Sequence, residues 1–175
     1  MTSLVVRAAQ CDDRLPVQRM LELYQYELSD IWEQELDVNG EYGYALDRYW
    51  AVGECKPFVL KVADRYAGFA LVNRESKVDQ GAHWMDQFFV LKKYRRHGFG
   101  TAAAGEVFSA VPGAWEVGQM MSNYVAQAFW RSVIASYTRG NFSEVKLTGG
   151  WWEGVVQCFQ VQASTSVGET YPSSK

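Results

Sequence analysis

The segment with the clearest chemistry is a basic run that leads into a glycine turn, LKKYRRHGFG at residues 91–100. Amides at a helix N-terminus have no acceptor within the helix and carry partial positive charge, so they bind phosphate well. Glycine lets phosphate oxygens reach the backbone, and the four basic side chains add counter-charge. The pattern indicates a phosphate site; a helix start behind a solvated basic loop is the competing interpretation.

Two better-known phosphate motifs fit this segment poorly. Gly98, Gly100 and Ala103 match G-x-G-x-x-A, the fingerprint of dinucleotide-binding folds, and Glu116 lies eighteen residues beyond Gly98. However, six mostly charged residues separate the turn from the preceding apolar run, and only 75 residues follow Gly100. No Gly-Lys-Ser/Thr sequence is present for a Walker loop. A nicotinamide-dependent enzyme therefore stands as the weaker alternative.

Hydrophobic spacing gives the elements that must position the turn. We expect strands at residues 3–8, 57–63, 66–73, 83–91, 114–120, 142–147 and 154–161. Helices are expected after Asp12 or Asp13, at 44–51, at 102–110 and after Asn123. The order β-α-α-β-β-β-α-β-α-β-β predicts a mixed α/β (α+β) sheet. Residues 1–162 read as one domain, and the polar segment 163–175 is expected to fray.

Composition excludes several classes of function. A formal net charge of −3 argues against a nucleic-acid binder, which needs a broad basic surface. No apolar run approaches the roughly 20 residues of a membrane span, and the first residues lack a signal-peptide pattern. Cys11, Cys55 and Cys158 are far apart and odd in number, so neither disulfides nor a zinc site is indicated. We expect a cytoplasmic protein without metal or membrane partner.

Taken together, these features resemble the GNAT superfamily of N-acetyltransferases. Residues 95–100 are similar to its pyrophosphate motif, which is Arg or Gln, two variable residues, Gly, one variable residue, then Gly or Ala. Val90 and Tyr94 match the strand and loop before that motif. The family's second block, Asn-x-x-Ala-x-x-hydrophobic-Tyr on a helix, is matched in spacing by Asn123, Ala126, Phe129 and Trp130. The resemblance also covers element order, and so nearly the whole chain.

This resemblance implies an acyl-CoA N-acyltransferase fold that moves an acetyl group from acetyl-CoA to an amine. The strand ending at Val90 would splay from strand 114–120, and the pantetheine arm would lie in the split. The Phe88 amide would then face the thioester oxygen as an oxyanion donor. The implied cofactor ligands are Phe88, Phe89, Val90, Arg95, Arg96, His97, Gly98, Phe99, Gly100, Thr101, Asn123, Phe129 and Trp130.

The general base is not fixed by the resemblance. Trp84 stands where the family often has glutamate, while Asp86 follows on the same strand face, two residues nearer the split. Asp86 is therefore the expected base, and a carboxylate that only satisfies the strand edge is the alternative. His83 is a further candidate, although a histidine at a strand start is more often structural.

The general acid is equally open. The leaving thiolate is usually reprotonated by a tyrosine, and this chain has Trp130 at that position. An indole N–H is a hydrogen-bond donor without usable acidity. Tyr124 and Tyr137 lie two helical turns to either side and are the expected substitutes, with solvent as the third option.

The acceptor side is indicated by an acidic segment, because residues 20–47 hold eight carboxylates and no Lys or Arg. In the family this region forms the acceptor wall, and the residues expected to line it are Trp32, Glu33, Tyr42 and Tyr44. Aromatic faces suit a cation, so the hypothesis is a small cationic amine; solvated carboxylates are the competing interpretation. A homodimer is possible. The rival function is an acyl-CoA-binding sensor without turnover.

Overall fold

A computed structural model of the chain describes residues 3–51, 53–150 and 152–163, so the expected frayed tail lies almost wholly outside the described residues. The predicted mixed α/β fold is confirmed as a seven-stranded sheet in the order β1-β2-β3-β4-β5-β7-β6. The strands are β1 (Leu4–Ala8), β2 (Lys56–Val62), β3 (Arg65–Asn73), β4 (His83–Val90), β5 (Gly113–Met120), β6 (Phe142–Leu147) and β7 (Gly154–Val161). The helices are α1 (Arg14–Trp32), α2 (Asp47–Trp50), α3 (Phe99–Ala110) and α4 (Tyr124–Thr138).

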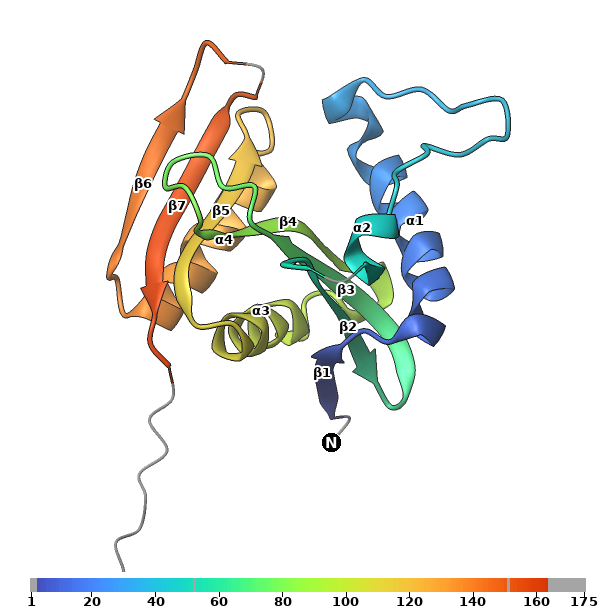
Figure 1. Cartoon of the computed structure of the whole chain (residues 1–175), viewed down its shortest axis with the longest axis horizontal. Helices are drawn as coiled ribbons and strands as arrows, with labels where there is room; N and C mark the ends of the chain where they lie inside the picture. Colours follow the sequence, from blue (N-terminus) through green and yellow to red (C-terminus); the bar gives the residue numbers. More distant parts are fainter. Residues whose placement is uncertain (1–2, 52, 151, 164–175) are drawn as a thin grey trace, which may run out of the picture.

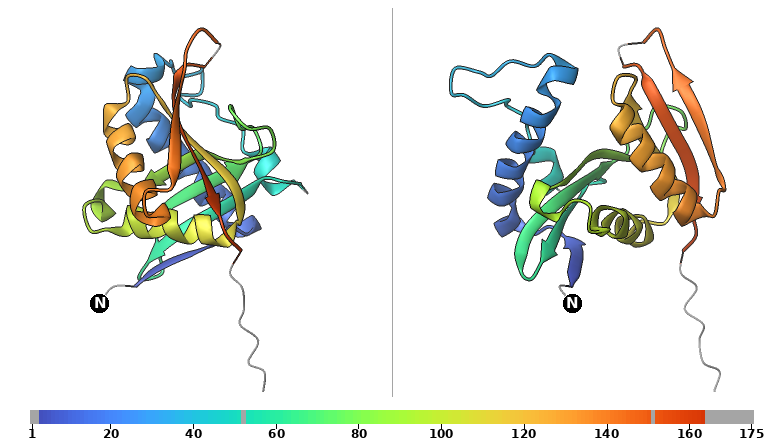
Figure 2. Two further views of the ribbon diagram at one scale, coloured as in Figure 1. Left: turned by 90° about the vertical axis from the view of Figure 1, so that its left-hand side faces the viewer. Right: turned by 180° about the vertical axis from the view of Figure 1, so that it is seen from behind.

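Two helices cover each face of this sheet (Figures 1 and 2). On one face, α1 and α2 bury Val17, Leu21 and Tyr49 against the apolar side chains of β2, β3 and β4. On the other face, α3 and α4 pack over β2 to β5 and β7. Since apolar residues of α1 recur at helical spacing, one stripe of the helix meets the sheet, as the sequence predicts.

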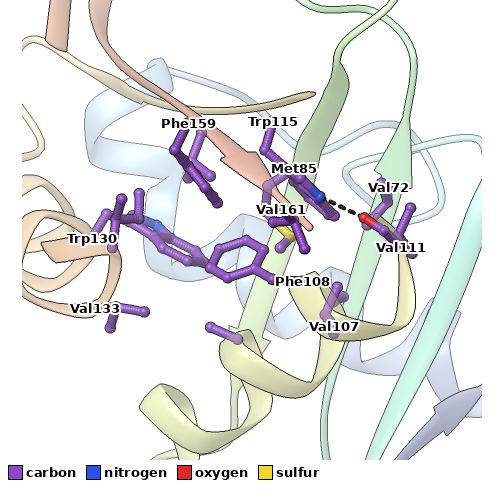
Figure 3. Close-up of a cluster of buried hydrophobic side chains, with 14 of the residues drawn as sticks. Val72, Met85, Val107, Phe108, Val111, Trp115, Trp130, Val133, Phe159 and Val161 are labelled. Atoms are coloured by element: carbon purple, nitrogen blue, oxygen red, sulfur yellow. Dashed lines mark hydrogen bonds between the residues drawn. The ribbon is translucent and has the colours of Figure 1, made fainter. Parts of the chain in front are cut away.

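The core beneath α3 and α4 is aromatic (Figure 3). The Phe108 ring has edge contacts with Trp115 and Phe159, each at 4.9 Å between ring centres. The indole N–H of Trp115 donates to the Val111 carbonyl at 2.7 Å, so its one polar atom is satisfied. Truncating a fully buried ring such as Phe108 to alanine typically costs about 3 to 5 kcal/mol. This cluster holds α3 and α4 against the sheet and thereby fixes the helix that follows the glycine turn.

The start of α1 differs in detail from the expected cap. Asp13 precedes the helix, but its side chain makes no capping bond to α1 and accepts the Gln10 backbone N–H at 2.8 Å. The carboxylate also accepts two hydrogen bonds from Arg7, at 2.6 and 3.0 Å, and one from the Tyr66 hydroxyl at 2.7 Å. These donors hold the pKa of Asp13 well below its usual range. The acid therefore ties β1 and β3 to the start of α1.

The turn between β2 and β3 and the start of α3 lie a few residues from where the sequence predicts them. The β2–β3 turn consists of Ala63 and Asp64, one residue earlier than expected, and both have positive φ, 49° and 59°. That geometry matches the twist of a tight hairpin. Helix α3 begins at Phe99 rather than at residue 102, because Gly98 takes a left-handed conformation with φ of 78° and starts the helix there.

Strands β4 and β5 run parallel and stay paired over only two positions, His83 with Trp115 and Trp84 with Glu116. Beyond these positions the strands diverge (Figure 1). The buried Glu116 carboxylate accepts backbone N–H groups of the β3–β4 loop, from Lys77 at 2.6 Å and Asp79 at 2.5 Å. These hydrogen bonds hold the β3–β4 loop at the paired end of β4 and β5. From there the two strands separate in the direction of the glycine turn.

Candidate active site

A cavity of about 650 Å³ lies at the split. One wall comes from the C-terminal half of α1 and the segment after it, the other from β4, β5 and the N-terminus of α4. Its aromatic lining residues are Tyr24, Trp32, Tyr44, Trp84, Trp130 and Trp152. Its charged lining residues are Glu33, Arg48, Glu75, Lys77 and Asp86. The cavity thus combines an apolar wall with a small number of charges, which is typical of a small-molecule site.

Asp86 sits at an irregularity of β4. Leu71 pairs with Gln87 and Val72 pairs with Met85, so Asp86 is an extra residue without a partner on β3. A bulge of this kind turns side chains out of the regular alternation, and it is common next to active sites. The expected base therefore lines the cavity, on the face of the sheet that also carries α1 and α2.

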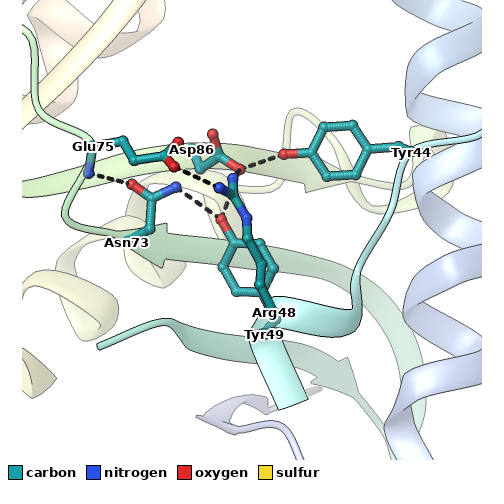
Figure 4. Close-up of polar contacts among 6 residues, drawn as sticks. All are labelled: Tyr44, Arg48, Tyr49, Asn73, Glu75 and Asp86. Atoms are coloured by element: carbon teal, nitrogen blue, oxygen red, sulfur yellow. Dashed lines mark hydrogen bonds and ion pairs between the residues drawn. The ribbon is translucent and has the colours of Figure 1, made fainter. Parts of the chain in front are cut away.

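The Asp86 carboxylate is held through one oxygen (Figure 4). Oδ2 accepts hydrogen bonds from the hydroxyls of Tyr44 at 2.5 Å and Tyr49 at 2.7 Å. Arg48 donates to the same oxygen at 3.2 Å and to Glu75 at 2.8 Å. Oδ1 makes no hydrogen bond within the described residues, which leaves it available to a ligand in the cavity.

Both tyrosines stay protonated near neutral pH. Burial, together with the Asp86 charge, raises the pKa of Tyr44 to about 12, and the same causes raise the pKa of Tyr49 further. Each hydroxyl is therefore a fixed donor toward Asp86 rather than a second base. Asn73 donates to the Tyr49 hydroxyl at 3.1 Å and so orients it. Asp86 and Tyr44 are the two members of this network predicted from the sequence, and Arg48, Tyr49, Asn73 and Glu75 are not.

The donor side of the split brings several predicted residues together. The Phe88 ring lies 5.0 Å from the Trp130 ring and 6.1 Å from the Phe129 ring. Phe129 also reaches the first turn of α3, since a Cβ on Gly100 would lie 3.4 Å from its ring. Phe89 points to the opposite face, where it packs with Tyr24 in the α1 core. The two sequence motifs thus meet across the end of β4.

The glycine turn has the shape expected of an anion site. Arg96 and Gly98 have positive φ, 62° and 78°, and the helix begins immediately afterwards. The amides of Phe99, Gly100 and Thr101 belong to the first helical turn, where no acceptor exists within the helix. His97 stacks on Phe99 at 6.0 Å, with Nδ1 2.7 Å from the Arg95 carbonyl. Conformation and exposed amides both favour a phosphate here.

The expected counter-charge is smaller than four basic side chains. Arg95 donates to Glu27 at 2.8 Å and to the Val90 carbonyl at 2.6 Å, so its guanidinium joins α1 to the end of β4. Lys92 approaches the same carboxylate at 3.8 Å. Glu27, far away in sequence, therefore offsets part of the positive charge that was expected to face a phosphate. Arg96 and Lys93 remain exposed on the turn.

Neither candidate acid lines the cavity. Tyr124 is 74% exposed at the start of α4. The Tyr137 hydroxyl lies 3.0 Å from Ser109 Oγ, and the ring packs on Phe108 in the core. Asn123 does line the cavity, and its Oδ1 caps α4 by accepting the Ala126 amide at 3.1 Å. The geometry gives no support to either tyrosine as the thiolate's proton donor.

Three of the four expected acceptor residues line the cavity, namely Trp32, Glu33 and Tyr44. Tyr42 does not, and its backbone N–H donates to Glu22 at 2.8 Å. Most of the acidic segment serves the fold: five of its eight carboxylates bind a backbone amide or a basic side chain, and these are Glu22, Glu27, Asp37, Glu41 and Asp47. The segment is therefore a weaker acidic field than its composition suggests.

His83 is buried at the far end of β4, where Nε2 lies 3.2 Å from the Pro112 carbonyl. Its pKa is lowered by burial, and it does not line the cavity. Within the part of the chain that the structure describes, no group of three His, Cys, Asp or Glu side chains could hold a metal ion. The described helices include none that is long and apolar enough to cross a bilayer.

The chain is similar to known proteins in its sequence and in its fold. The model of the acetyltransferase (GNAT) family matches residues 17–133. No curated protein matches the sequence significantly. Among solved structures, an acetyltransferase from Thermus thermophilus has a TM-score of 0.66 at 15% identity over 91% of this chain and 97% of that one.

Two further structures share this fold at low identity. The ribosomal-protein-S18-alanine N-acetyltransferase from Escherichia coli has a TM-score of 0.57 at 13% identity, over 97% of this chain and 99% of that one. The PaiA N-acetyltransferase from Thermoplasma acidophilum, solved in complex with coenzyme A, has a TM-score of 0.55 at 11% identity, over 90% and 99%. At such identities the likeness concerns the fold.

Proposed function

Because this chain belongs to the acetyltransferase (GNAT) family, we propose that it moves the acetyl group of acetyl-CoA to a primary amine bound beside Asp86. The observation that carries the proposal is the split between β4 and β5, whose cavity contains an open carboxylate oxygen, together with the glycine turn that follows β4. A donor lying in the split and an amine in the cavity would meet near the end of β4. Direct transfer needs no covalent enzyme intermediate and no metal.

The donor would be bound by groups that fit its chemistry. The amides of Phe99, Gly100 and Thr101 suit the pyrophosphate, because they are unpaired donors at a helix N-terminus. A Cβ at position 100 would lie 3.4 Å from the Phe129 ring, so the turn has room for glycine or a very small side chain and not for a long one. The pantetheine arm would continue between the unpaired parts of β4 and β5, beside Phe88 and Trp130. Phe88 N–H remains our proposed donor to the thioester oxygen.

The acceptor must lose a proton before or during attack. An ammonium ion would bind Asp86 Oδ1 and first pass one proton to that oxygen, directly or through a water molecule, which frees the lone pair that attacks the acetyl carbon. The nitrogen, positively charged once the new bond forms, would lose its second proton to solvent. Tyr44, Tyr49 and Arg48 would hold the carboxylate in place through Oδ2 during this transfer. The C–N bond forms, the C–S bond breaks, and the electron pair leaves with the sulfur.

The leaving thiolate would take its proton from solvent. Trp130 replaces the expected acid, and neither Tyr124 nor Tyr137 lines the cavity. The indole N–H of Trp130 makes no hydrogen bond within the described residues. This N–H can therefore donate a hydrogen bond to the sulfur without protonating it. A thiolate is stable enough near neutral pH to leave without a general acid, because a free thiol has a pKa of about 8.5.

Thiol release from acetyl-CoA across a panel of primary amines tests the proposal. We expect CoA to appear in proportion to acetylated amine, identified by mass. Binding of acetyl-CoA without release by any amine would instead support the acyl-CoA sensor, for which Trp130 in place of tyrosine is the motivating observation. A thermal shift with NAD and none with acetyl-CoA would refute both assignments.

A further inference from the structure

A pair of tryptophans forms a shelf on the acceptor side of the split. Trp84 on β4 and Trp152 before β7 meet edge to face, with ring centres 5.8 Å apart and planes at 85°. Both line the cavity, and so do Trp32 on the opposite wall and Trp130 on α4. The cavity therefore takes four of the chain's seven tryptophans. Trp84 and Trp130 are buried, Trp152 is partly exposed and Trp32 is exposed, so the indole lining runs from the protein interior to solvent.

Two glycines inside strands make room for this shelf. A Cβ on Gly118 of β5 would collide with the Trp84 indole and lie 3.0 Å from Trp152. A Cβ on Gly154 of β7 would lie 2.5 Å from Trp152. Glycine within a strand costs about 0.5 to 1 kcal/mol relative to alanine. At Gly154 a Cβ would also lie 2.3 Å from the Gln119 carbonyl oxygen, so Gly118 is the position whose glycine specifically seats the two indoles. We regard the shelf as a built feature of the cavity.

The shelf lies next to the open carboxylate. Trp84 and Asp86 are separated on β4 only by Met85, at most about 7 Å of strand, and both line the cavity. A ligand whose nitrogen contacts Asp86 Oδ1 would bring a group two or three carbons away over the indoles. Aromatic rings pack favourably against the face or edge of another ring. The spacing therefore suits an aryl group on a short alkyl amine.

The charges around the shelf disfavour a second ammonium group. Arg48 already bridges Glu75 and Asp86, and Lys77 lies over the Trp84 ring at 5.1 Å. A second ammonium group placed over the shelf would lie near these two cations, whereas Glu33 lies on the opposite wall of the cavity. An uncharged ring meets no such repulsion, and it can replace water on the exposed part of Trp152. This arrangement narrows the predicted acceptor from any small cationic amine to an amine whose remaining part is uncharged.

From these observations we infer that the acceptor is a primary amine with an aromatic ring two or three carbons from the nitrogen. The inference rests on the proposed acetyl transfer and deepens it by naming the acceptor class. A free arylalkylamine and the N-terminus of a peptide that begins with phenylalanine share this chemistry. The experiment therefore includes both sources.

The test compares kcat/KM for phenethylamine, n-butylamine, spermidine and a phenylalanine-initiated dipeptide amide, with binding to the CoA-loaded protein measured by calorimetry. We expect one of the two aromatic acceptors to exceed n-butylamine at least about tenfold, since a well-formed apolar pocket discriminates by that order. Trp152→Ala should lower this ratio to about twofold or less, because half of the shelf is lost. Tyr26→Ala is the matched control: that ring is 67% exposed outside the cavity, and the ratio should not change.

Each outcome decides between the inference and the function beneath it. Equal or better turnover of n-butylamine or spermidine overturns the aromatic acceptor and leaves acetyl transfer intact. An unchanged ratio in Trp152→Ala also overturns it, and Trp84→Phe provides a second, more conservative check on the same shelf. Ring-selective binding without any thiol release keeps the shelf as an aryl-amine site and refutes the transferase. Preference for the dipeptide over phenethylamine identifies peptide N-termini as the source.

Discussion

Replacing Asp86 by asparagine isolates the proposed proton transfer from the packing around it. The asparagine oxygen can occupy the Oδ2 position and accept from Tyr44, Tyr49 and Arg48, while Arg48 keeps its second partner Glu75 at 2.8 Å. The amide group then points an N–H₂ donor into the cavity where the open oxygen was. We therefore expect a folded protein that has lost its proton acceptor.

The expected magnitude follows from this geometry. A general base contributes about 10² to 10⁴ in rate, so kcat of Asp86→Asn should fall by that factor, equivalent to about 3 to 5 kcal/mol in activation free energy. The free energy of unfolding should fall by about 1 to 3 kcal/mol, because the three hydrogen bonds to Oδ2 lose the charge of their acceptor while none is lost. Affinity for acetyl-CoA, measured by calorimetry, should be nearly unchanged, since Asp86 is not a proposed donor ligand.

A matched control comes from Asp13, a second carboxylate that accepts from an arginine and a tyrosine but lies outside the cavity. Asp13→Asn makes the same chemical change and should lower Tm without lowering kcat. The deficit of Asp86→Asn should also shrink with a weakly basic amine such as trifluoroethylamine, which is already neutral at assay pH. Unchanged kcat in Asp86→Asn, or an equal loss in Asp13→Asn, would refute the assignment of the base.

Three further outcomes test other parts of the site and the fold. Gly100→Glu should fold, because a carboxylate suits a helix N-terminus, yet lose more than about 100-fold in acetyl-CoA affinity by calorimetry as its side chain fills the anion site beside Phe129; retained affinity removes the turn from the cofactor site. Trp130→Tyr should change kcat by less than about threefold if solvent protonates the thiolate, and a tenfold gain would show that an acid was missing. Because the pKa of Asp13 is lowered in the folded state, its stabilisation is present above pH about 4, the unfolded value, and is lost as pH falls through the lowered pKa; Asp13→Asn should remove that part of the acid-induced fall in Tm.

Elements dominated by local patterns were predicted well from the sequence. Strands β6 and β7 begin and end at the expected residues, because turn-forming glycines flank alternating apolar runs. Asn123 caps α4 as its position before the helix indicates. The separation of β4 from β5 also agrees with the family resemblance. Composition alone does not indicate that these two strands separate. Errors here were shifts of one to three residues at turns.

Features that depend on distant partners could not be read from the sequence. Arg95 was expected at the phosphate and instead pairs with Glu27, 68 positions away. Arg48 and Glu75 join Asp86 from two other segments, and nothing in their local sequence marks them. The Gly-Gly-Trp-Trp run at 149–152 did carry a signal for Trp152, since an aromatic cluster in a polar turn is unusual. A side chain's partner is set by tertiary packing, which overrides local preference.

The positions of Trp84 and Asp86 explain each other. Were the carboxylate at residue 84, it would lie where β4 still pairs with β5, over Gly118 and against Trp152. Moved to the bulge at residue 86, it gains three donors and an open oxygen while leaving the paired region to an indole. Trp84 can then pack on glycine and extend the apolar wall that the acceptor would meet. On this view, tryptophan in place of the family's frequent glutamate accompanies two changes in the proposed site. The proposed base lies at Asp86 instead of residue 84, and the Trp84 indole forms part of the shelf beside it.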